Sequence, residues 1–75
     1  MIETKVLINS VEKVKNFSAA ISAFGAECEI IKDYNIIDAK SIMGIFSINL
    51  DEPVTLRIHS DNPEILEKIK EWIAE

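Results

Sequence analysis

The feature that most constrains the fold is a strict alternation of apolar and polar residues over residues 54–59. The apolar set is Val54, Leu56 and Ile58, and the polar set is Thr55, Arg57 and His59. Successive side chains of a β-strand point to opposite faces, so the pattern predicts a strand with one buried and one solvent-facing side. Such a strand belongs to a sheet that is covered on one face only.

Other segments also have strand character. Residues 3–8 and 27–32 contain β-branched residues at alternating positions. Asp33-Tyr34-Asn35 has turn chemistry, because Asp and Asn bond back to the backbone and tolerate the left-handed conformation. A short strand begins after this turn, so residues 27–39 are predicted to form a hairpin.

The first predicted helix covers residues 11–24. Its apolar face recurs at a spacing of three or four residues: Val11, Val14, Phe17, Ser18, Ile21 and Phe24. Either Asn9 or Ser10 can cap its start, and Asn9 with Glu12 has the spacing of a capping box. Gly25 is expected to end the helix in the left-handed conformation.

Two more helices follow. Ser41 can cap a short helix over residues 42–48, with Asn49 as a left-handed stop. Asn62 as cap and Pro63 at the first helical position are strong start signals for the last helix. Its predicted buried stripe is Ile65, Leu66, Ile69, Trp72 and Ile73.

The element order is therefore β-α-β-β-α-β-α. This order implies an α+β fold, an open-faced two-layer sandwich with a four-stranded antiparallel sheet and three helices on one face. The 75 residues are about half the common domain size, so residues 1–75 are predicted to form a single domain.

Composition excludes several classes of function. The net charge of −5 disfavours a nucleic-acid or anionic-membrane partner, since both require clustered cations. The sequence has one cysteine, Cys28, and one histidine, His59. It therefore cannot form an internal disulfide and has almost no cysteine or histidine ligands for a metal site. No apolar run approaches the roughly 20 residues of a membrane span, and no signal-peptide pattern begins the chain. We therefore expect a cytoplasmic protein without cofactor or metal.

The usual catalytic patterns are also missing, so no enzymatic activity is predicted. The two glycines, Gly25 and Gly44, are isolated and form no phosphate-binding loop. His59 could accept a phosphoryl group near the next helix start, but Asp61 and Glu64 would repel that anion, so an exposed strand-end histidine is the preferred interpretation. Cys28 lies between acidic neighbours and is interpreted as a buried apolar residue.

The segment 38–47, Asp-Ala-Lys-Ser-Ile-Met-Gly-Ile-Phe-Ser, carries the main candidate site. A helix this short cannot bury all of its apolar residues, so Ile42, Met43 and Phe46 are candidates for a docking surface. Ser41 at the helix start is a candidate for phosphorylation, because a phosphate there would meet unpaired N–H groups. The competing interpretation makes Ser41 only a cap and the apolar residues core, and physical reasoning alone favours it.

This segment resembles the regulatory-serine segment of HPr, the histidine-containing phosphocarrier of the bacterial phosphoenolpyruvate-dependent sugar phosphotransferase system. The Lys-Ser-Ile-Met-Gly core carries the resemblance, and the element order also matches the HPr sandwich. The resemblance implies that Ser41 is a target for a kinase of the HPr-kinase type. It also implies that Ile42, Met43 and Phe46 help to contact a partner protein, either that kinase or a regulator.

The resemblance fails at the phosphoryl-carrying histidine. An alignment from Ser41 backwards puts Ser10 at the histidine position and Glu12 at the arginine position, whereas an alignment from the first strand puts Lys15 and Phe17 there. Neither register supplies an imidazole or a phosphate-binding cation. We therefore expect a regulatory, protein-binding HPr-like module. The alternatives are a phosphocarrier that uses another site such as His59, or an unrelated small α+β binding domain.

Overall fold

The structure is a computed structural model in which residues 1–74 are described. Its elements are β1 (Ile2–Val6), α1 (Val11–Ser22), β2 (Cys28–Lys32), β3 (Asn35–Asp38), α2 (Ile42–Ile45), β4 (Val54–Ile58), α3 (Pro63–Ile69) and a 3₁₀ turn (Lys70–Trp72). This order confirms the predicted β-α-β-β-α-β-α sequence of elements. None of the helices in this part of the chain is long and apolar enough to cross a membrane.

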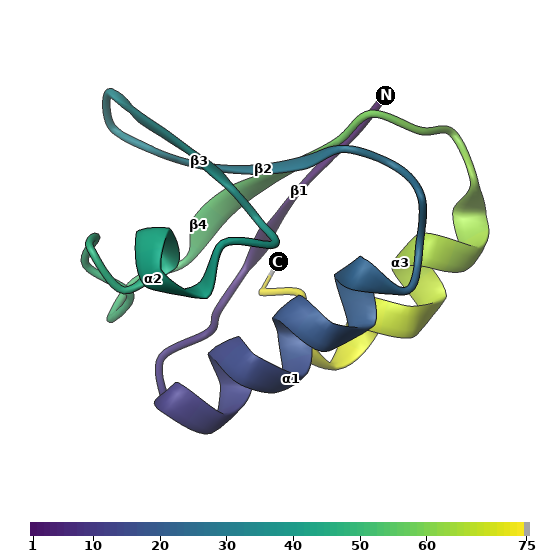
Figure 1. Ribbon diagram of the computed structural model, residues 1–75. Helices are drawn as coiled ribbons and strands as arrows, with labels where there is room; N and C mark the ends of the chain where they lie inside the picture. Colours follow the sequence, from purple (N-terminus) through teal and green to yellow (C-terminus); the bar gives the residue numbers. More distant parts are fainter. Residues whose placement is uncertain (75) are drawn as a thin grey trace.

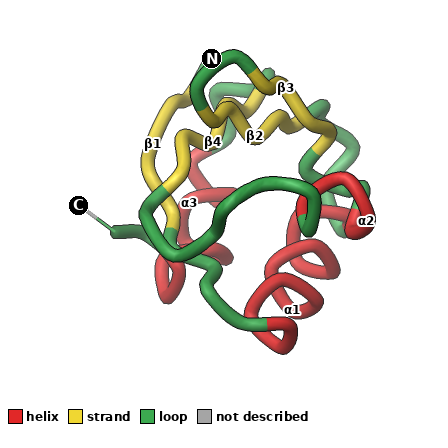
Figure 2. Tube along the Cα trace, turned by 90° about the vertical axis from the view of Figure 1, so that its left-hand side faces the viewer, coloured by secondary structure: helices red, strands yellow, loops and turns green. Residues whose placement is uncertain are grey.

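The four strands form one antiparallel sheet in the order β1-β4-β2-β3. Leu56 of β4 lies at the centre, opposite Thr4 of β1 on one side and Ile30 of β2 on the other. The helices lie on one side of the sheet, below the strands in Figure 2, and the other face is open (Figures 1 and 2). The α+β open-faced sandwich is therefore confirmed.

The core lies between the sheet and the helices. The alternating residues of β4 that were predicted to face inward are buried, as are Cys28 and Ile30 of β2. Phe17 of α1 meets Trp72 edge to face, with ring centroids 5.7 Å apart and planes at 85°. This geometry suits the quadrupoles of the two rings and joins α1 to the C-terminal turn.

The hairpin of β2 and β3 turns through two residues. Lys32 pairs with Asn35, and Asp33 between them has a φ of 55°. Asp is among the few residues other than glycine that adopt this conformation readily. The predicted turn chemistry is therefore confirmed.

The start of α1 agrees with one of the two predicted caps, and its end differs from prediction. Ser10 is the cap, because its Oγ accepts a hydrogen bond from the N–H of Lys13 at 3.1 Å, so the other candidate, Asn9 with its capping-box spacing, does not cap the helix. The helix ends at Ser22, and neither glycine of the chain has a positive φ, so Gly25 is not a left-handed stop. Val11, predicted to be buried, is 62% exposed because the first helical position lies beyond the edge of the core.

The other boundaries were also predicted too long. β1 ends at Val6, since Leu7 already donates its N–H to the carbonyl of Trp72 at 2.8 Å. α2 covers only four residues, and Asn49 is not left-handed but accepts the N–H of Asp51 on its side chain. α3 ends at Ile69 and continues as the 3₁₀ turn, which carries Trp72 into the core.

Candidate functional site

The start of α2 is fixed by a tight turn after β3. The carboxylate of Asp38 accepts the N–H of Lys40 at 2.9 Å, and the carbonyl of Asp38 accepts the N–H of Ser41, also at 2.9 Å. Aspartate favours such a turn because its side chain reaches the backbone two residues further on. Asp38 therefore sets the position at which Ser41 enters the helix.

Ser41 is both the cap of α2 and an exposed hydroxyl. Its Oγ accepts the N–H of Gly44 at 3.3 Å, which is the capping bond predicted from the sequence. The side chain is open to solvent. The hydroxyl is therefore accessible at the surface while it caps the helix.

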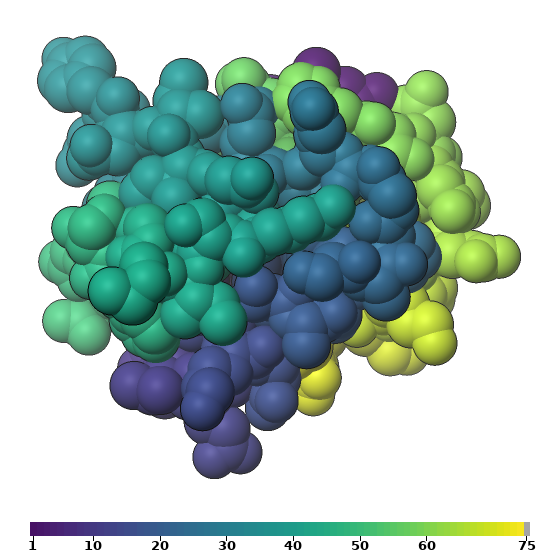
Figure 3. All heavy atoms as spheres, in the orientation of Figure 1, coloured from purple at the N-terminus to yellow at the C-terminus, as the bar shows by residue number. Residues whose placement is uncertain are grey.

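The apolar residues of α2 divide into one anchor and three surface residues. Ile45 is fully buried and holds the helix against the core. Met43 is 84% exposed, Phe46 41% and Ile42 37%. We call Ile42, Met43 and Phe46 the α2 patch. In Figure 3 the teal atoms of the segment around α2 stand at the surface that faces the reader.

Lys40 precedes Ser41 in the sequence, but its ammonium group bonds to another part of the chain. Its Nζ donates to the carbonyl of Phe24 at 3.2 Å, just beyond the end of α1. A cation at this position compensates carbonyl groups that lack helical partners. Lys40 therefore ties the β3–α2 turn to α1.

The two positions that could replace the phosphoryl-carrying histidine lie in different places. Ser10 stands at the junction between β1 and α1, with Glu12 in the first turn of the helix. Lys15 lies on the exposed side of α1, one turn further along. The Oγ of Ser10 accepts the backbone N–H of Lys13, and within residues 1–74 no hydrogen bond joins it to a side-chain base that could activate it as a nucleophile.

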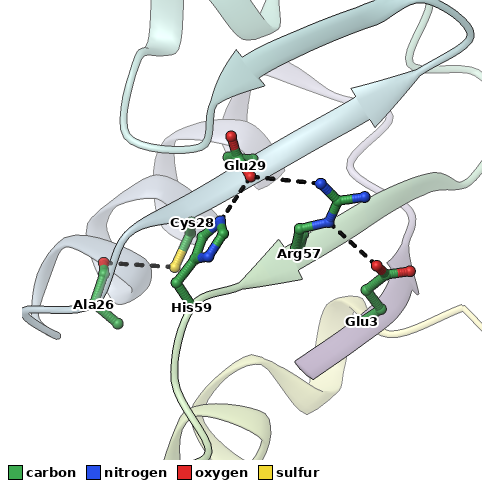
Figure 4. Close-up of polar contacts among 6 residues, drawn as sticks. All are labelled: Glu3, Ala26, Cys28, Glu29, Arg57 and His59. Carbon is green, nitrogen blue, oxygen red and sulfur yellow. Dashed lines mark hydrogen bonds and ion pairs between the residues drawn. The ribbon is translucent and has the colours of Figure 1, made fainter. Parts of the chain in front are cut away.

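His59 belongs to a polar network on the open face of the sheet (Figure 4). Its Nε2 lies 2.8 Å from Oε1 of Glu29, while Arg57 bonds Glu3 at 3.2 Å and approaches Glu29 at 3.9 Å. A phosphoryl group on Nε2 would displace this contact and lie beside the carboxylate of Glu29. The contact between His59 and Glu29, thirty residues apart, was missed from the sequence.

Cys28 precedes Glu29 in β2, and its side chain points to the opposite, buried face of the sheet. Its Sγ donates to the carbonyl of Ala26 at 3.7 Å, and the side chain is buried. Burial raises the pKa of the thiol, an effect that Lys40 opposes and Asp38 reinforces. The thiol is therefore protonated at neutral pH and is a poor nucleophile. Within residues 1–74 no three His, Cys, Asp or Glu side chains are grouped so that they could hold a metal ion.

Comparisons with known proteins agree with this geometry. No protein-family model and no curated protein sequence matches the chain. Several solved structures do match the chain. HPr-C-His from Thermoanaerobacter tengcongensis matches with a TM-score of 0.79 and 25% identity, over 95% of this chain and 89% of that one. The phosphocarrier protein HPr from Bacillus anthracis matches with a TM-score of 0.73 and 27% identity, over 97% and 96%.

A third match shows the fold alone. The histidine-containing phosphocarrier protein of Mycoplasma has a TM-score of 0.73 but only 18% identity, over 93% of this chain and 89% of that one. The three structures share the open-faced sandwich fold of this chain. The chain is HPr-like: at 25% and 27% identity over almost its whole length it resembles the first two, which are HPr proteins. The alternative of an unrelated α+β domain is therefore wrong.

Proposed function

We propose that this chain is a cytoplasmic regulatory module of the sugar phosphotransferase system that binds a protein partner through the α2 patch. Phosphorylation of Ser41 would switch this binding. The partner is either a kinase of the HPr-kinase type or a regulator. The observation that carries the proposal is the exposure of Met43, 84% open beside the fully buried Ile45.

The packing of α2 supports a docking role for its outer residues. Ile45 is fully buried, whereas Ile42, Met43 and Phe46 present exposed area that a partner can cover. Methionine adapts its shape to different partners because it is unbranched and polarisable. Removing such a side chain should weaken binding more than it weakens the fold.

The position of Ser41 supports a switch that acts through charge. A phosphate would add about two negative charges directly beside the apolar patch. The nearest lysine in sequence, Lys40, donates its Nζ to the carbonyl of Phe24 rather than to Ser41. Covering the phosphate with an apolar partner surface would then cost desolvation energy, whereas a partner with an arginine at this place would be favoured.

The chemistry of the other candidate positions supports a role without phosphoryl transfer. No side-chain base is hydrogen-bonded to Ser10 in residues 1–74, and Nε2 of His59 contacts the carboxylate of Glu29 at 2.8 Å. Phosphoryl transfer to nitrogen requires a free nucleophile and a cation to hold the phosphate. The Oγ of Ser10 accepts its hydrogen bond from a backbone N–H, and the ring contact of His59 is a carboxylate rather than a cation.

The experiment is a quantitative capture of host proteins on the immobilised chain, repeated with Met43→Glu. We expect the specifically bound protein to be lost from the variant. The occupancy of Ser41 is measured by phosphopeptide mass spectrometry on protein purified from its host. Ser41→Asp should then change the affinity for the captured partner by at least about fivefold, while Lys70→Gln, which changes the net charge by the same amount on the C-terminal turn, should not.

A further inference from the structure

We propose that the free edge of β3 accepts an extended, cationic segment of a partner protein as a fifth strand of the sheet. This is a different surface from the α2 patch and does not depend on the function proposed for it. The inference rests on three observations. The C-terminal segment covers the β1 edge of the sheet but not the β3 edge, β3 exposes backbone hydrogen-bonding groups, and exposed carboxylates lie beside them.

The edge of the sheet at β1 is covered. The C-terminal segment runs beside it, where Ala74 donates to the carbonyl of Lys5 and Leu7 donates to the carbonyl of Trp72, both at 2.8 Å. Val6 and Ile73 form an antiparallel bridge there. In residues 1–74 no segment is paired in this way with the outer side of β3.

The backbone of β3 presents hydrogen-bonding groups at this edge. Ala39 donates to the carbonyl of Cys28 at 2.9 Å, so Ala39 faces β2. Because successive residues of a strand alternate in direction, Ile36 and Asp38 face outward. The carbonyl of Asp38 is occupied by Ser41. The groups that remain for an added strand are the N–H and C=O of Ile36 and the N–H of Asp38.

The side chains give this edge little protection. Proteins shield an edge strand by keeping it short or with charged side chains, lysine above all, proline, a bulge or a covering segment. β3 has the short sequence Asn-Ile-Ile-Asp, in which Asp38 is the one charged residue and neither lysine nor proline occurs. Ile36 is 63% exposed on the outer face, and Tyr34 in the adjoining turn is fully exposed. An added strand would cover both side chains with its own alternate residues.

The charges at this edge select the chemistry of the partner. Asp33 and Asp38, at its two ends, are exposed carboxylates without an ion-pair partner in residues 1–74. The neighbouring cations are engaged elsewhere: Lys32 bonds Glu52 at 3.1 Å and Lys40 bonds Phe24. Asp38 ends β3 and Asp33 lies in the turn that precedes it, so a heptapeptide with lysines at both ends and between them can meet both carboxylates.

A second copy of this chain fits the edge less well. Each copy has a net charge of −5 and would bring two more carboxylates to the same place. A strand of four residues also buries far less than the roughly 1,200 Å² of a stable specific interface. The favoured occupant is therefore an extended segment in which lysine or arginine alternates with β-branched residues.

The test is a titration of the ¹⁵N-labelled full chain with the acetylated and amidated peptide Lys-Val-Lys-Val-Thr-Val-Lys. We expect saturable shifts centred on the amides of Ile36 and Asp38. The matched peptide with glutamate in place of each lysine should bind at least about tenfold more weakly. Met43→Glu should leave the titration unchanged, so failure here and failure of the α2 proposal are distinguishable.

Two variants test the backbone pairing. Ile36→Pro removes only an outward N–H and should weaken binding about fivefold, since edge strands tolerate proline. Ile36→Lys keeps the backbone intact but places a cation on the edge, and it should also weaken binding of the basic peptide. Shifts that centre elsewhere, equal binding of both peptides, or a dimer in sedimentation velocity that Ile36→Lys abolishes would each overturn the proposal.

Discussion

A Cβ atom placed on Gly44 would lie 2.9 Å from Cγ2 of Ile37, so α2 approaches β3 at a distance that only glycine permits. The same atom would lie 3.1 Å from Oγ of Ser41. Gly44 therefore brings the helix against the sheet and leaves room for the capping hydroxyl. This relationship gives a structural reason for the glycine of the Lys-Ser-Ile-Met-Gly segment.

Gly44→Ala should destabilise the protein. Overpacking against Ile37 costs about 1–3 kcal/mol, which exceeds the gain of about 1 kcal/mol from replacing a helical glycine. We expect the free energy of unfolding to fall by about 1 kcal/mol, measured by urea denaturation.

Gly25→Ala is the matched control. A Cβ atom on Gly25 has no neighbour within 4 Å, and its φ is not positive. This variant should be neutral or more stable by up to about 1 kcal/mol. Equal effects at the two glycines would show that the contact between Gly44 and Ile37 does not limit the packing of α2.

Ser10→Ala should lower the free energy of unfolding by about 1 kcal/mol, because it removes the capping bond to the N–H of Lys13. Ser22→Ala is the comparison, since Ser22 is exposed at the other end of α1 and should change stability by less than about 0.5 kcal/mol. Thermal and urea unfolding measure both. No loss at Ser10 would mean that the cap does not stabilise the helix.

The elements could be predicted because their signals are local. The alternation at Val54, Leu56 and Ile58 depends only on the two-residue period of a strand, and Asn62 with Pro63 marks a helix start through its own chemistry. The boundaries depend on tertiary contacts. α1 ends at Ser22, and Nζ of Lys40 donates to the carbonyl of Phe24 two residues further on, a contact that no local pattern reveals.

The open-face network could not be predicted for a similar reason. The sequence places Arg57 and His59 on one polar face, but their contact with Glu29 requires β4 to pair with β2 in one register. Glu29 lies directly opposite Arg57, and His59 follows two residues later, just beyond the end of β4. The pairing of distant strands is set by the whole core rather than by the residues that meet.

The buried thiol predicts a pH dependence of stability. Burial raises the pKa of Cys28 above its usual value of 9.0, with Lys40 opposing and Asp38 adding to the effect. The unfolded chain then loses the thiol proton at a lower pH than the folded chain. The free energy of unfolding is therefore unaffected well below pH 9.0 and falls as the pH rises through the pKa of the folded thiol.

Urea unfolding at about pH 8 and about pH 10.5 measures this loss, with Cys28→Ala as the reference in which it is absent. All other titrating groups are common to both proteins, so they cancel in the comparison. An identical decline in the two proteins would show that the thiol titrates normally in the folded state.

Incubation with phosphoenolpyruvate and the first enzyme of the phosphotransferase system should leave no acid-labile phosphate on the chain. His59 is the only histidine, and its Nε2 faces the carboxylate of Glu29. Intact-mass spectrometry measures the product, with an active HPr as the positive control. A phosphorylated form that disappears in His59→Gln would establish the alternative site.

The most direct measurement of the central claim is the affinity of the captured partner for the chain, for Met43→Glu and for Met43→Leu. Met43 is 84% exposed, so both variants should unfold within about 0.5 kcal/mol of the parent chain. The leucine variant should bind as the parent does, and the glutamate variant at least about tenfold more weakly. Equal affinity of all three proteins would contradict docking through the α2 patch.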